Sequence, residues 1–318
     1  MMYNKNEISK LATETGFIRD NLEKVLRLID VLSFISNNNF LSERLVLKGG
    51  TAINLTVFEM PRLSVDIDLD FSQNVSKEEM MSDRQLIYQQ INGFMVTNGY
   101  SEHSGSKSPL SLDSWIYRYR NAVGNLDNIK IEINYSMRCH VLPSVVKTVT
   151  IPFLNNVLVK TLSPIELFAS KIKALTERAA CRDLFDINNM IINKLFNHVD
   201  IELLRKIYLF YLAVGGSKKP RTEYDFNSIN SIMFKNIRSS LLPVLKKSEK
   251  FDLEAAKTRV LTFLSLLTIF SDSEKQFINQ FNNGIYNPDL LFEKDLADRV
   301  RNHPMALWKT RQQDRDIS

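Results

Sequence analysis

The stretch "LKGGTAINLTVFEMPRLSVDIDLDF" at residues 47–71 decides the fold. Its last third alternates strictly between polar and apolar residues, which predicts a β-strand over 63–71. Side chains two apart on a strand point the same way, so Asp66, Asp68 and Asp70 share one face. The apolar residues between them occupy the other face, which can pack on a core.

The segment before this strand has the pattern of a phosphate-binding turn. "RLVLKGG" at 44–50 predicts a short buried strand that ends at the glycines, and "TAINLTVFE" predicts a helix that begins there. Gly49 and Gly50 let the backbone approach an anion closely, and N–H groups at a helix N-terminus bind phosphate. Thr51 adds a hydroxyl donor. A plain tight turn with a threonine cap is the structural alternative.

The row of aspartates suits a magnesium ion, which takes hard oxygen ligands and shares its other positions with water or phosphate. Calcium in an EF-hand loop is excluded, because the sixth position of "DIDLDF" is Phe71 in place of glycine and the twelfth is Lys77 in place of glutamate. The structural alternative is an edge strand whose solvated face carries charge.

A third carboxylate follows on another predicted strand, "NIKIEINY" at 128–135. Lys130, Glu132 and Asn134 share its polar face, and isoleucines occupy the other. Glu132 is therefore the candidate third metal ligand, and Lys130 is expected to reach a phosphate or to pair with the acidic residues. An ordinary polar outer face is again the alternative.

The remaining patterns predict an α+β chain. Helices are expected over 6–37 and over 76–100, where Ser76 and Glu79 form a capping box. Further strands are expected in three places: 113–135 (two strands), 145–153 and 156–162. After residue 162 the pattern is helical almost throughout. We therefore expect a catalytic domain over 1–160 and a helical domain over 161–318.

The first helix of the second half begins with a clear signal. Ser163 is its expected N-cap, Pro164 occupies its first position, and Glu166 lies three residues after the serine.

Charged side chains recur at helical spacing in this part of the chain. Lys171 and Arg178 are seven residues apart and fall on one side of a helix, while Asp183 and Asp186 are neighbours on the next one. The alternative is a helix hairpin with surface ion pairs, since helix surfaces are usually charged.

Composition sets the wider limits. The 318 residues are 44% hydrophobic and 24% charged, and the net charge of +5 divides into −1 over 1–159 and +6 over 160–318. A basic second half suits a polyanionic partner or, equally, a soluble surface. The polar N-terminus and the lack of a long apolar run predict no secretion signal and no membrane span, hence a cytoplasmic protein.

These motifs together resemble a known family. "KGGTA" at 48–52 and "RLSVDIDL" at 62–69 resemble the first motif of the polymerase-β-like nucleotidyltransferases, and more narrowly that of the AbiEii/AbiGii toxins. "KIEIN" at 130–134 resembles the family's second motif, and "KIKALTERAACRDLFD" at 171–186 resembles its third and fourth.

The resemblance implies a nucleotidyltransferase fold, a mixed sheet flanked by helices and followed by a mostly helical domain. It implies that Asp66, Asp68 and Glu132 bind two Mg²⁺ ions, with Asp70 as an extra carboxylate. It also implies nucleotide-binding residues, namely Lys48, Gly49, Gly50, Thr51, Lys171, Arg178 and Arg182. For the active-site aspartate of the second half, Asp183 is the first candidate and Asp186 the second. This aspartate would orient Lys171 or deprotonate the attacking hydroxyl.

The function so implied is that of a type IV toxin–antitoxin system, in which the toxin transfers a nucleotide from an NTP to RNA. The tRNA 3′ acceptor end is the expected acceptor, translation is the expected target, and a winged-helix antitoxin is the expected partner. Three alternatives stay open: nucleotidyl transfer to a protein or small molecule, transfer of the γ-phosphate, and a non-enzymatic protein that binds RNA or a partner.

Overall fold

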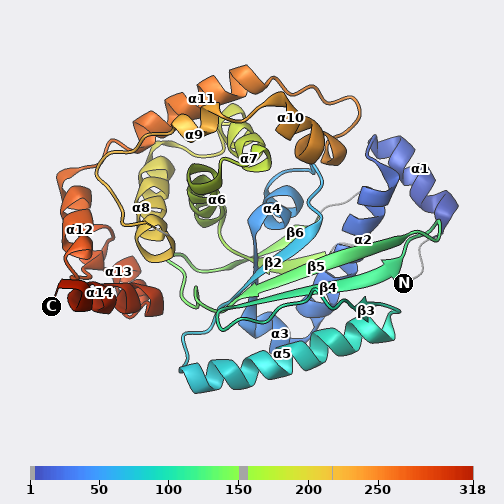
Figure 1. Ribbon diagram of the computed structural model, residues 1–318, viewed down its shortest axis with the longest axis horizontal. Helices are drawn as coiled ribbons and strands as arrows, with labels where there is room; N and C mark the ends of the chain where they lie inside the picture. The colour runs from blue at the N-terminus through green and yellow to red at the C-terminus, as the bar shows by residue number, and fades with distance from the viewer. Residues whose placement is uncertain (1–3, 150–156, 217, 318) are drawn as a thin grey trace. The chain divides into compact units, whose positions relative to one another are not determined.

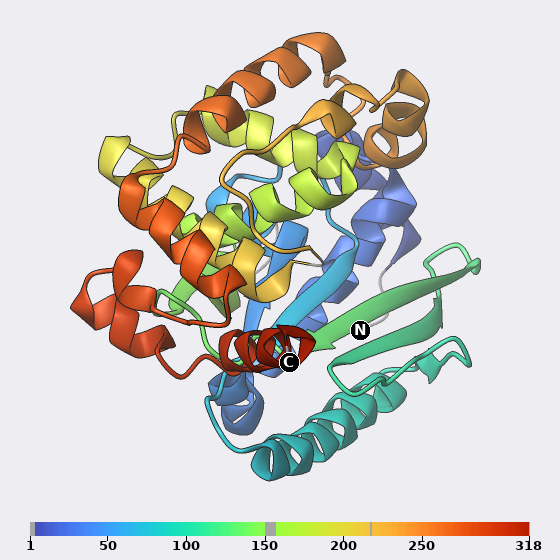
Figure 2. The ribbon, with the colours of Figure 1, turned by 60° about the vertical axis from the view of Figure 1, so that its left-hand side comes forward.

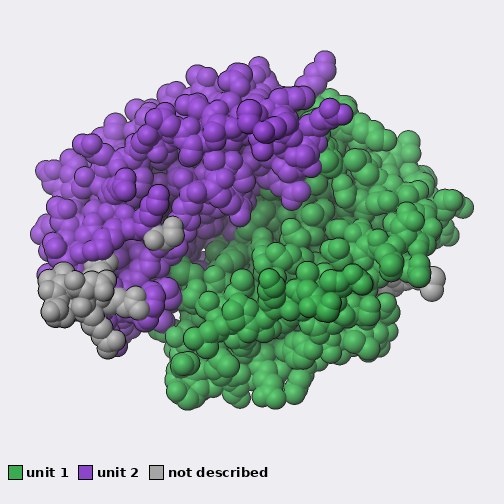
Figure 3. Space-filling view, in the orientation of Figure 1, with its two compact units in different colours: residues 1–138, 144–162, 242–249 green, residues 139–143, 163–241, 250–318 purple. Residues whose placement is uncertain are grey.

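The computed structural model describes residues 4–149, 157–216 and 218–317, with side chains up to residue 311. The chain forms two compact units (Figure 3). Unit 1 consists of residues 1–138, 144–162 and 242–249, and unit 2 of residues 139–143, 163–241 and 250–318. Unit 1 contains the strands and several helices, and unit 2 is helical, so the expected α+β class is confirmed.

Unit 1 is built on one mixed sheet, which has seven strands within the described residues, in the order β3-β4-β5-β2-β1-β7-β6 (Figure 1). Strands β2 and β5 run parallel, as do β1 and β7, and the other neighbours are antiparallel. The strands are β1 (Leu45–Lys48), β2 (Asp66–Phe71), β3 (Ser101–Glu102), β4 (Leu112–Arg120), β5 (Leu126–Asn134), β6 (Val145–Val149) and β7 (Val157–Thr161).

The sheet confirms the strands expected from alternation. Each predicted segment contains a strand, and within 113–135 the strands β4 and β5 are joined by residues 121–125. Of the segments expected at 145–153 and 156–162, residues 150–156 lie outside the described residues.

Helices from two parts of unit 1, residues 19–37 and 77–97, cover the apolar face of this sheet. The helical segments of unit 1 are α1 (Lys5–Thr15), α2 (Arg19–Asn37), α3 (Asn39–Arg44), α4 (Gly49–Ala52), η1 (Ile53–Val57), α5 (Lys77–Thr97) and η3 (Leu242–Val244). Helix α5 lies along β3 and β4 (Figures 1 and 2), where Tyr88 packs edge-on against Trp115 with ring centroids 5.3 Å apart. Phe34 of α2 stacks on Phe94 of α5 at 4.2 Å. Trp115 is buried and Tyr88 is partly exposed, and aromatic pairs of this kind contribute about 0.5–1.5 kcal/mol beyond the area they bury.

A buried polar network ties α5 to the same face. Arg84 of α5 donates to both carboxylate oxygens of Asp113 on β4, at 3.1 and 2.6 Å, and Tyr135 donates to Asp113 at 2.9 Å. The expected capping box of Ser76 and Glu79 at the start of α5 is confirmed. Helix α5 is therefore held at its first turn and along its length.

A late segment of the chain returns to unit 1. The backbone N–H of Leu63, just before β2, donates to the carbonyl of Val244 at 2.8 Å, and Arg62 forms an isolated bridge with Leu245. On the other side of the segment, the side chain of Asn21 donates to the carbonyl of Pro243 at 2.7 Å. Residues 242–249 thus support the approach to β2.

Unit 2 is a bundle of helices around α6 and α8. Its elements are α6 (Pro164–Arg178), α7 (Cys181–Ile192), α8 (His198–Gly215), α9 (Asn227–Asn230), α10 (Phe234–Asn236), η2 (Ile237–Leu241), α11 (Leu253–Leu267), α12 (Asp272–Asn282), η4 (Pro288–Leu290), α13 (Lys294–Val300) and α14 (Pro304–Ile317). Fully buried residues of α6 and α8, such as Phe168 and Tyr208, form its core. Among the described residues, no helix is both long and apolar enough to cross a membrane.

The first helix of unit 2 begins where the sequence predicts. Ser163 caps α6 by accepting a hydrogen bond from the backbone N–H of Glu166. The Glu166 side chain is fully buried and accepts from the backbone N–H groups of Val141 at 2.8 Å and Leu142 at 3.0 Å, and from the Tyr211 hydroxyl at 2.6 Å. This carboxylate therefore anchors residues 139–143 to unit 2.

Candidate active site

The polar face of β2 presents the aspartates that the sequence singled out. Ile67, Leu69 and Phe71 are buried on the apolar face, while Asp66 and Asp68 are half-buried on the other. Strand β2 pairs with β5 in a parallel register in which Asp68 lies opposite Glu132. All three candidate metal ligands therefore lie on one face of two adjoining strands.

Glu132 already has partners on this face. The Ser114 hydroxyl of β4 donates to its Oε1 at 3.1 Å, and the Lys130 ammonium lies 2.7 Å from the same oxygen. Burial lowers the pKa of Lys130, but the attraction of Glu132, Asp66 and Asp68 outweighs it, so the pKa lies above its ordinary value. Lys130 pairs with the acidic cluster, and its ammonium shows that this face attracts a cation.

The glycine turn fits closely against the aspartates. Gly49 has a φ of +71°, a left-handed conformation that glycine adopts without strain, and a Cβ there would collide with a carboxylate oxygen of Asp68. A Cβ on Gly50 would lie 2.8 Å from the Arg62 guanidinium and 3.0 Å from the Ser64 hydroxyl. Gly49 is thus required for the turn to pass over the acidic face, and a side chain at position 50 would displace Arg62 or Ser64.

Two of the expected phosphate-binding side chains make other contacts. The Thr51 hydroxyl is buried and donates to the backbone carbonyl of Asp66. The Lys48 ammonium forms an ion pair with Asp70, which is also buried. These contacts brace the turn against β2, so any role of Thr51 in binding phosphate is left to its backbone.

The donor chemistry of the face matches a hard divalent cation, since Asp66, Asp68 and Glu132 all offer carboxylate oxygens. Within the described residues, however, no three acidic, histidine or cysteine side chains converge closely enough to form a ready-made metal site. Asp66, Asp68 and Glu132 are the residues that could hold Mg²⁺.

Unit 2 contains the second expected cluster. The Lys171 ammonium of α6 donates to Asp183 Oδ1 at 3.0 Å and lies 3.4 Å from Asp186 Oδ2. Arg178, at the end of α6, donates to both oxygens of Asp183 at 2.8 and 3.1 Å. The i, i+3 spacing on α7 therefore places both aspartates against one lysine.

The Lys171–Asp183 pair of this cluster is almost fully buried. The side chains of Lys171 and Asp183 are 7% and 1% exposed, whereas that of Arg178 is 63% exposed. Burial raises the pKa of Asp183, but Lys171 and Arg178 outweigh it and hold that pKa below its ordinary value. An aspartate so stabilised as the anion is a poor proton acceptor and a good support for Lys171.

Arg182, expected to bind the nucleotide, lies elsewhere in the unit. Its Nε donates to the backbone carbonyl of Ser240 at 2.7 Å and so ties α7 to η2.

The sequence patterns did not assign a role to Arg62 or Ser114. Arg62 is buried beneath Gly50 and donates to the carbonyl of Leu63 at 2.9 Å. The register of β4 against β5 places Ser114 opposite Glu132, which makes it a hydrogen-bond partner of that residue. The alternation of polar residues along 112–120 is the signal that could have found it.

Comparison with known proteins supplies a family and a fold. Residues 33–259 match the family model described as "Nucleotidyl transferase AbiEii toxin, Type IV TA system". The search of curated proteins gives no match. Among solved structures, MenT4, a nucleotidyltransferase toxin from Mycobacterium tuberculosis H37Rv, is similar with a TM-score of 0.62 and 16% sequence identity. That alignment covers 96% of this chain and 99% of MenT4, so the likeness in fold extends over both whole chains.

Proposed function

We propose, from the premise that this chain belongs to the AbiEii family of nucleotidyltransferase toxins in type IV toxin–antitoxin systems, that it transfers a nucleotide from an NTP to RNA. Membership in this family means that the chain is an enzyme with a nucleotide substrate. It also means that the chain is a toxin with a cognate antitoxin. The proposal adds an acceptor, the 3′ end of tRNA, and an outcome, arrested translation. It also places the protein in the cytoplasm and gives it a winged-helix antitoxin.

The observation that carries the proposal is the fit of Gly49 against Asp68. A turn that no side chain fills passes directly over a carboxylate, next to a second strand that offers Glu132. Nucleotidyl transfer needs phosphate binding and carboxylate oxygens side by side, because the triphosphate and its cation are bound together. Unit 1 places the glycine turn, which would bind the phosphates, against the carboxylates.

The reaction exchanges one phosphoryl ester for another. The terminal hydroxyl oxygen of the RNA attacks the α-phosphorus, the bond from that phosphorus to the bridging oxygen of the β-phosphate breaks, and pyrophosphate leaves. The hydroxyl proton passes to solvent. Mg²⁺, bound by Asp66, Asp68 and Glu132, would neutralise the phosphate charge and lower the pKa of the hydroxyl. The backbone of Gly49 and Gly50 would bind the outer phosphates.

Within unit 2, Lys171 is proposed to bind phosphate, a role that rests on the family resemblance. Asp183 and Asp186 position its ammonium through the ion pairs of 3.0 and 3.4 Å. Because the pKa of Asp183 is lowered, we assign Asp183 to orienting Lys171 and not to taking the hydroxyl proton. The exposed Arg178 is a further candidate for phosphate or RNA.

The test is incubation of the purified protein with bulk tRNA, Mg²⁺ and each α-labelled NTP in turn. Wild type should label RNA, and the Asp66→Ala, Asp68→Ala variant should not. A Glu78→Gln variant, changed at an exposed carboxylate of α5, is the matched control and should label as wild type does. Chelation of divalent cations with EDTA should abolish labelling.

Parallel arms separate the other functions. Label that appears on a protein or small molecule would replace RNA as the acceptor. Label transferred from the γ-position and not from the α-position would make the protein a phosphotransferase. No transfer to any acceptor, with RNA binding that survives loss of Asp66 and Asp68, would contradict an enzymatic role.

A further inference from the structure

The candidate active-site face continues onto β4. Antiparallel pairing places Ser114 opposite Glu132, Arg118 opposite Asn128 and Arg120 opposite Leu126. Directly paired residues point to the same side of a sheet, so the two arginines lie on the face that carries the carboxylates. At about 3.4 Å per residue, Arg118 lies about 14 Å along the strand from Ser114 and Arg120 about 20 Å.

The charge on this face changes sign along the strands. Among the described residues of β4 and β5, the positions between Glu132 and the hairpin that share its face hold no carboxylate: Ser114, Ile116, Arg118, Arg120, Leu126, Asn128 and Lys130. The acidic residues nearby point the other way, because Glu102 pairs with Tyr117 and Asp127 pairs with Tyr119, and both tyrosines are buried. The face therefore runs from acidic at the active site to basic at the hairpin.

Both arginines are exposed, and the opposite side of β4 is covered. Tyr117, on the covered side, donates to Asn92 of α5 at 3.2 Å, and α5 also holds Asp113. Arg120 donates one hydrogen bond to the carbonyl of Gly124 at 3.0 Å, which fixes its direction across the hairpin. The arginines are thus presented by a strand that is supported from behind.

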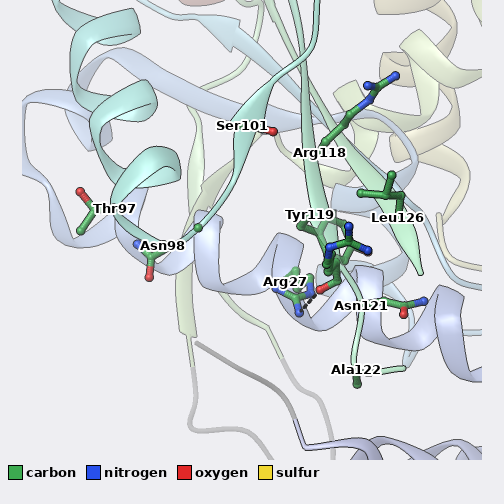
Figure 4. A pocket seen from close by; sticks show the side chains of 11 residues that line it. Arg27, Thr97, Asn98, Ser101, Arg118, Tyr119, Asn121, Ala122 and Leu126 are labelled. Carbon is green, nitrogen blue, oxygen red and sulfur yellow. Dashed lines mark hydrogen bonds between the residues drawn. The ribbon is translucent and has the colours of Figure 1, made fainter. Parts of the chain in front are cut away.

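An open hollow of about 970 Å³ lies at the end of this row (Figure 4). Arg118, Arg120, Ser101 and the 66%-exposed Leu126 contribute to its lining, and residues 97–99 at the end of α5 with Tyr119 line it from the covered side of β4, so the hollow lies at the rim of the sheet. Deeper in, the Arg27 guanidinium lies 4.3 Å from the Tyr119 ring centroid and is paired with Glu23 at 2.8 Å. Arg27 is therefore part of the wall, and the exposed arginines are the groups available to a ligand.

A further cation borders the row nearer the carboxylates. Lys107 forms an isolated antiparallel bridge with Ser114, with N–H to carbonyl distances of 2.9 and 2.8 Å in the two directions. It is exposed and lies beside the strand that carries the arginines. Cations thus flank the polar face from the level of Glu132 to the hairpin.

We propose that this row, Arg118 and Arg120 with Lys107, binds the phosphate backbone of the RNA strand whose end receives the nucleotide. The inference rests on the proposed function and adds the surface that positions the acceptor. An acceptor hydroxyl at the carboxylates must be followed by the phosphates of its own strand, and this face continues from the carboxylates with the opposite charge. Arginine binds phosphate bidentately, and Leu126 offers an apolar surface to an unstacked base.

An RNA strand fits the face better than an acidic protein segment does. The arginines lie on the strand that pairs with the strand of Glu132, so the row continues directly from the residues proposed to act on the RNA end. An RNA strand that reaches those residues must pass along this face, whereas a protein partner need not. The antitoxin is kept as an outcome of the test.

The experiment measures binding of bulk tRNA to the full chain by filter retention, without NTP, from 50 to 200 mM KCl. The test variant is Arg118→Ala with Arg120→Ala, and a second variant carries lysine at both positions. Lys147→Ala is the matched control, because Lys147 is an exposed cation on β6 at the other edge of the sheet. Thermal unfolding checks that the variants are folded.

The alanine pair should bind tRNA about 10- to 50-fold more weakly, and the slope of log affinity against log salt should fall by about 1.4, or 0.7 for each lost contact. The lysine pair should keep the slope, and the Lys147 variant should bind within about twofold of wild type, since it removes a charge outside the row. Unchanged affinity and slope in the alanine pair would overturn the inference, as would failure of wild type to bind RNA.

Two further outcomes keep this inference apart from the proposed function, and a third separates RNA from a protein partner. RNA label from wild type, with normal RNA affinity in the alanine pair, overturns the inference and leaves the proposed function standing. Lost RNA affinity in the pair, with no RNA label from wild type, overturns the proposed function and leaves an RNA-binding face. Normal RNA affinity with lost neutralisation by the antitoxin would make the face a protein interface and overturn the inference.

Discussion

The acidic face of unit 1 and the ion-pair cluster of unit 2 use the same residue types in opposite ways. On β2 and β5, carboxylates lie half-exposed along strands, and the Lys130 ammonium lies against Glu132. In unit 2, Lys171 and Asp183 are buried against each other. The first arrangement gathers like charges where a ligand can reach them, and the second pairs opposite charges within the fold.

The difference separates charges that await a ligand from charges that hold a structure. Like charges brought together in the open cost free energy that a bound cation recovers, so such a face is informative about function. A buried ion pair is costly to break, because the remaining charge is left in a medium of low polarity. Substitutions of the half-exposed carboxylates of unit 1 should therefore affect activity more than stability, whereas substitutions in the buried cluster of unit 2 should affect stability as well as any role in binding phosphate.

The largest effect is expected at the acidic face. Asp66→Asn with Asp68→Asn should lower nucleotide transfer by about 10³-fold or more, because the ligands that would bind the cation are lost. The free energy of unfolding should change by less than about 1 kcal/mol, since both side chains are half-exposed. Transfer of α-label and urea unfolding measure the two effects. A large loss of stability would erase the contrast between the units.

The next effect should appear in the free energy of unfolding. Lys171→Met leaves Asp186 without its buried cation and should cost about 3–5 kcal/mol. Lys173→Met removes the partner of Glu177 on the same helix. This ion pair is more exposed than that of Lys171, so its loss should cost less than about 1 kcal/mol. Urea unfolding of both variants measures this. If the Lys171 variant is as stable as wild type yet inactive, the cluster acts on substrate alone.

A smaller effect is expected at the glycine turn. Gly49→Ala puts a Cβ in a left-handed conformation and against Asp68, and should cost about 1–3 kcal/mol together with a loss of transfer activity. Gly93→Ala in α5 is the matched substitution, because apart from its neighbours in the helix no atom lies within 4 Å of the added Cβ. It should stabilise the protein by about 0.5–1 kcal/mol. Equal effects of the two substitutions would mean that the turn does not need its glycine.

The last prediction concerns pH. Lys171 and Arg178 hold the pKa of Asp183 below its ordinary value in the folded chain, so its ionised form stabilises the fold above the unfolded pKa, about 3.9. That contribution should be lost as the pH falls from there through the folded pKa. Unfolding of wild type and Asp183→Asn at pH 7, 5, 4 and 3 should show a stability difference that shrinks below about pH 4. A difference that grows on acidification would contradict the ion pairs.

Much of the fold could be predicted because periodicity and burial agree. The alternation at 63–71 predicted β2 and its buried face, and the helix signals at Ser76 and Ser163 predicted where α5 and α6 begin. These features depend on residues close together in the sequence, so local patterns carry them.

Contacts between distant segments could not be predicted in this way. The pairing of Lys48 with Asp70 depends on the register of β1 against β2, and the register is set by the whole sheet. Glu166 has the spacing of a capping residue, yet backbone donors at residues 141 and 142 bind it. The roles of the candidate site residues stay predictions, which the substitutions above test.

The return of residues 242–249 to unit 1 has a consequence for how the cell makes this protein. Arg62, which lies beneath Gly50, is bridged by Leu245, and Leu63 is bound by Val244. A ribosome builds these partners long after the glycine turn itself has left the exit tunnel. A nascent chain therefore lacks these two contacts beside its glycine turn until residues 242–249 have been made.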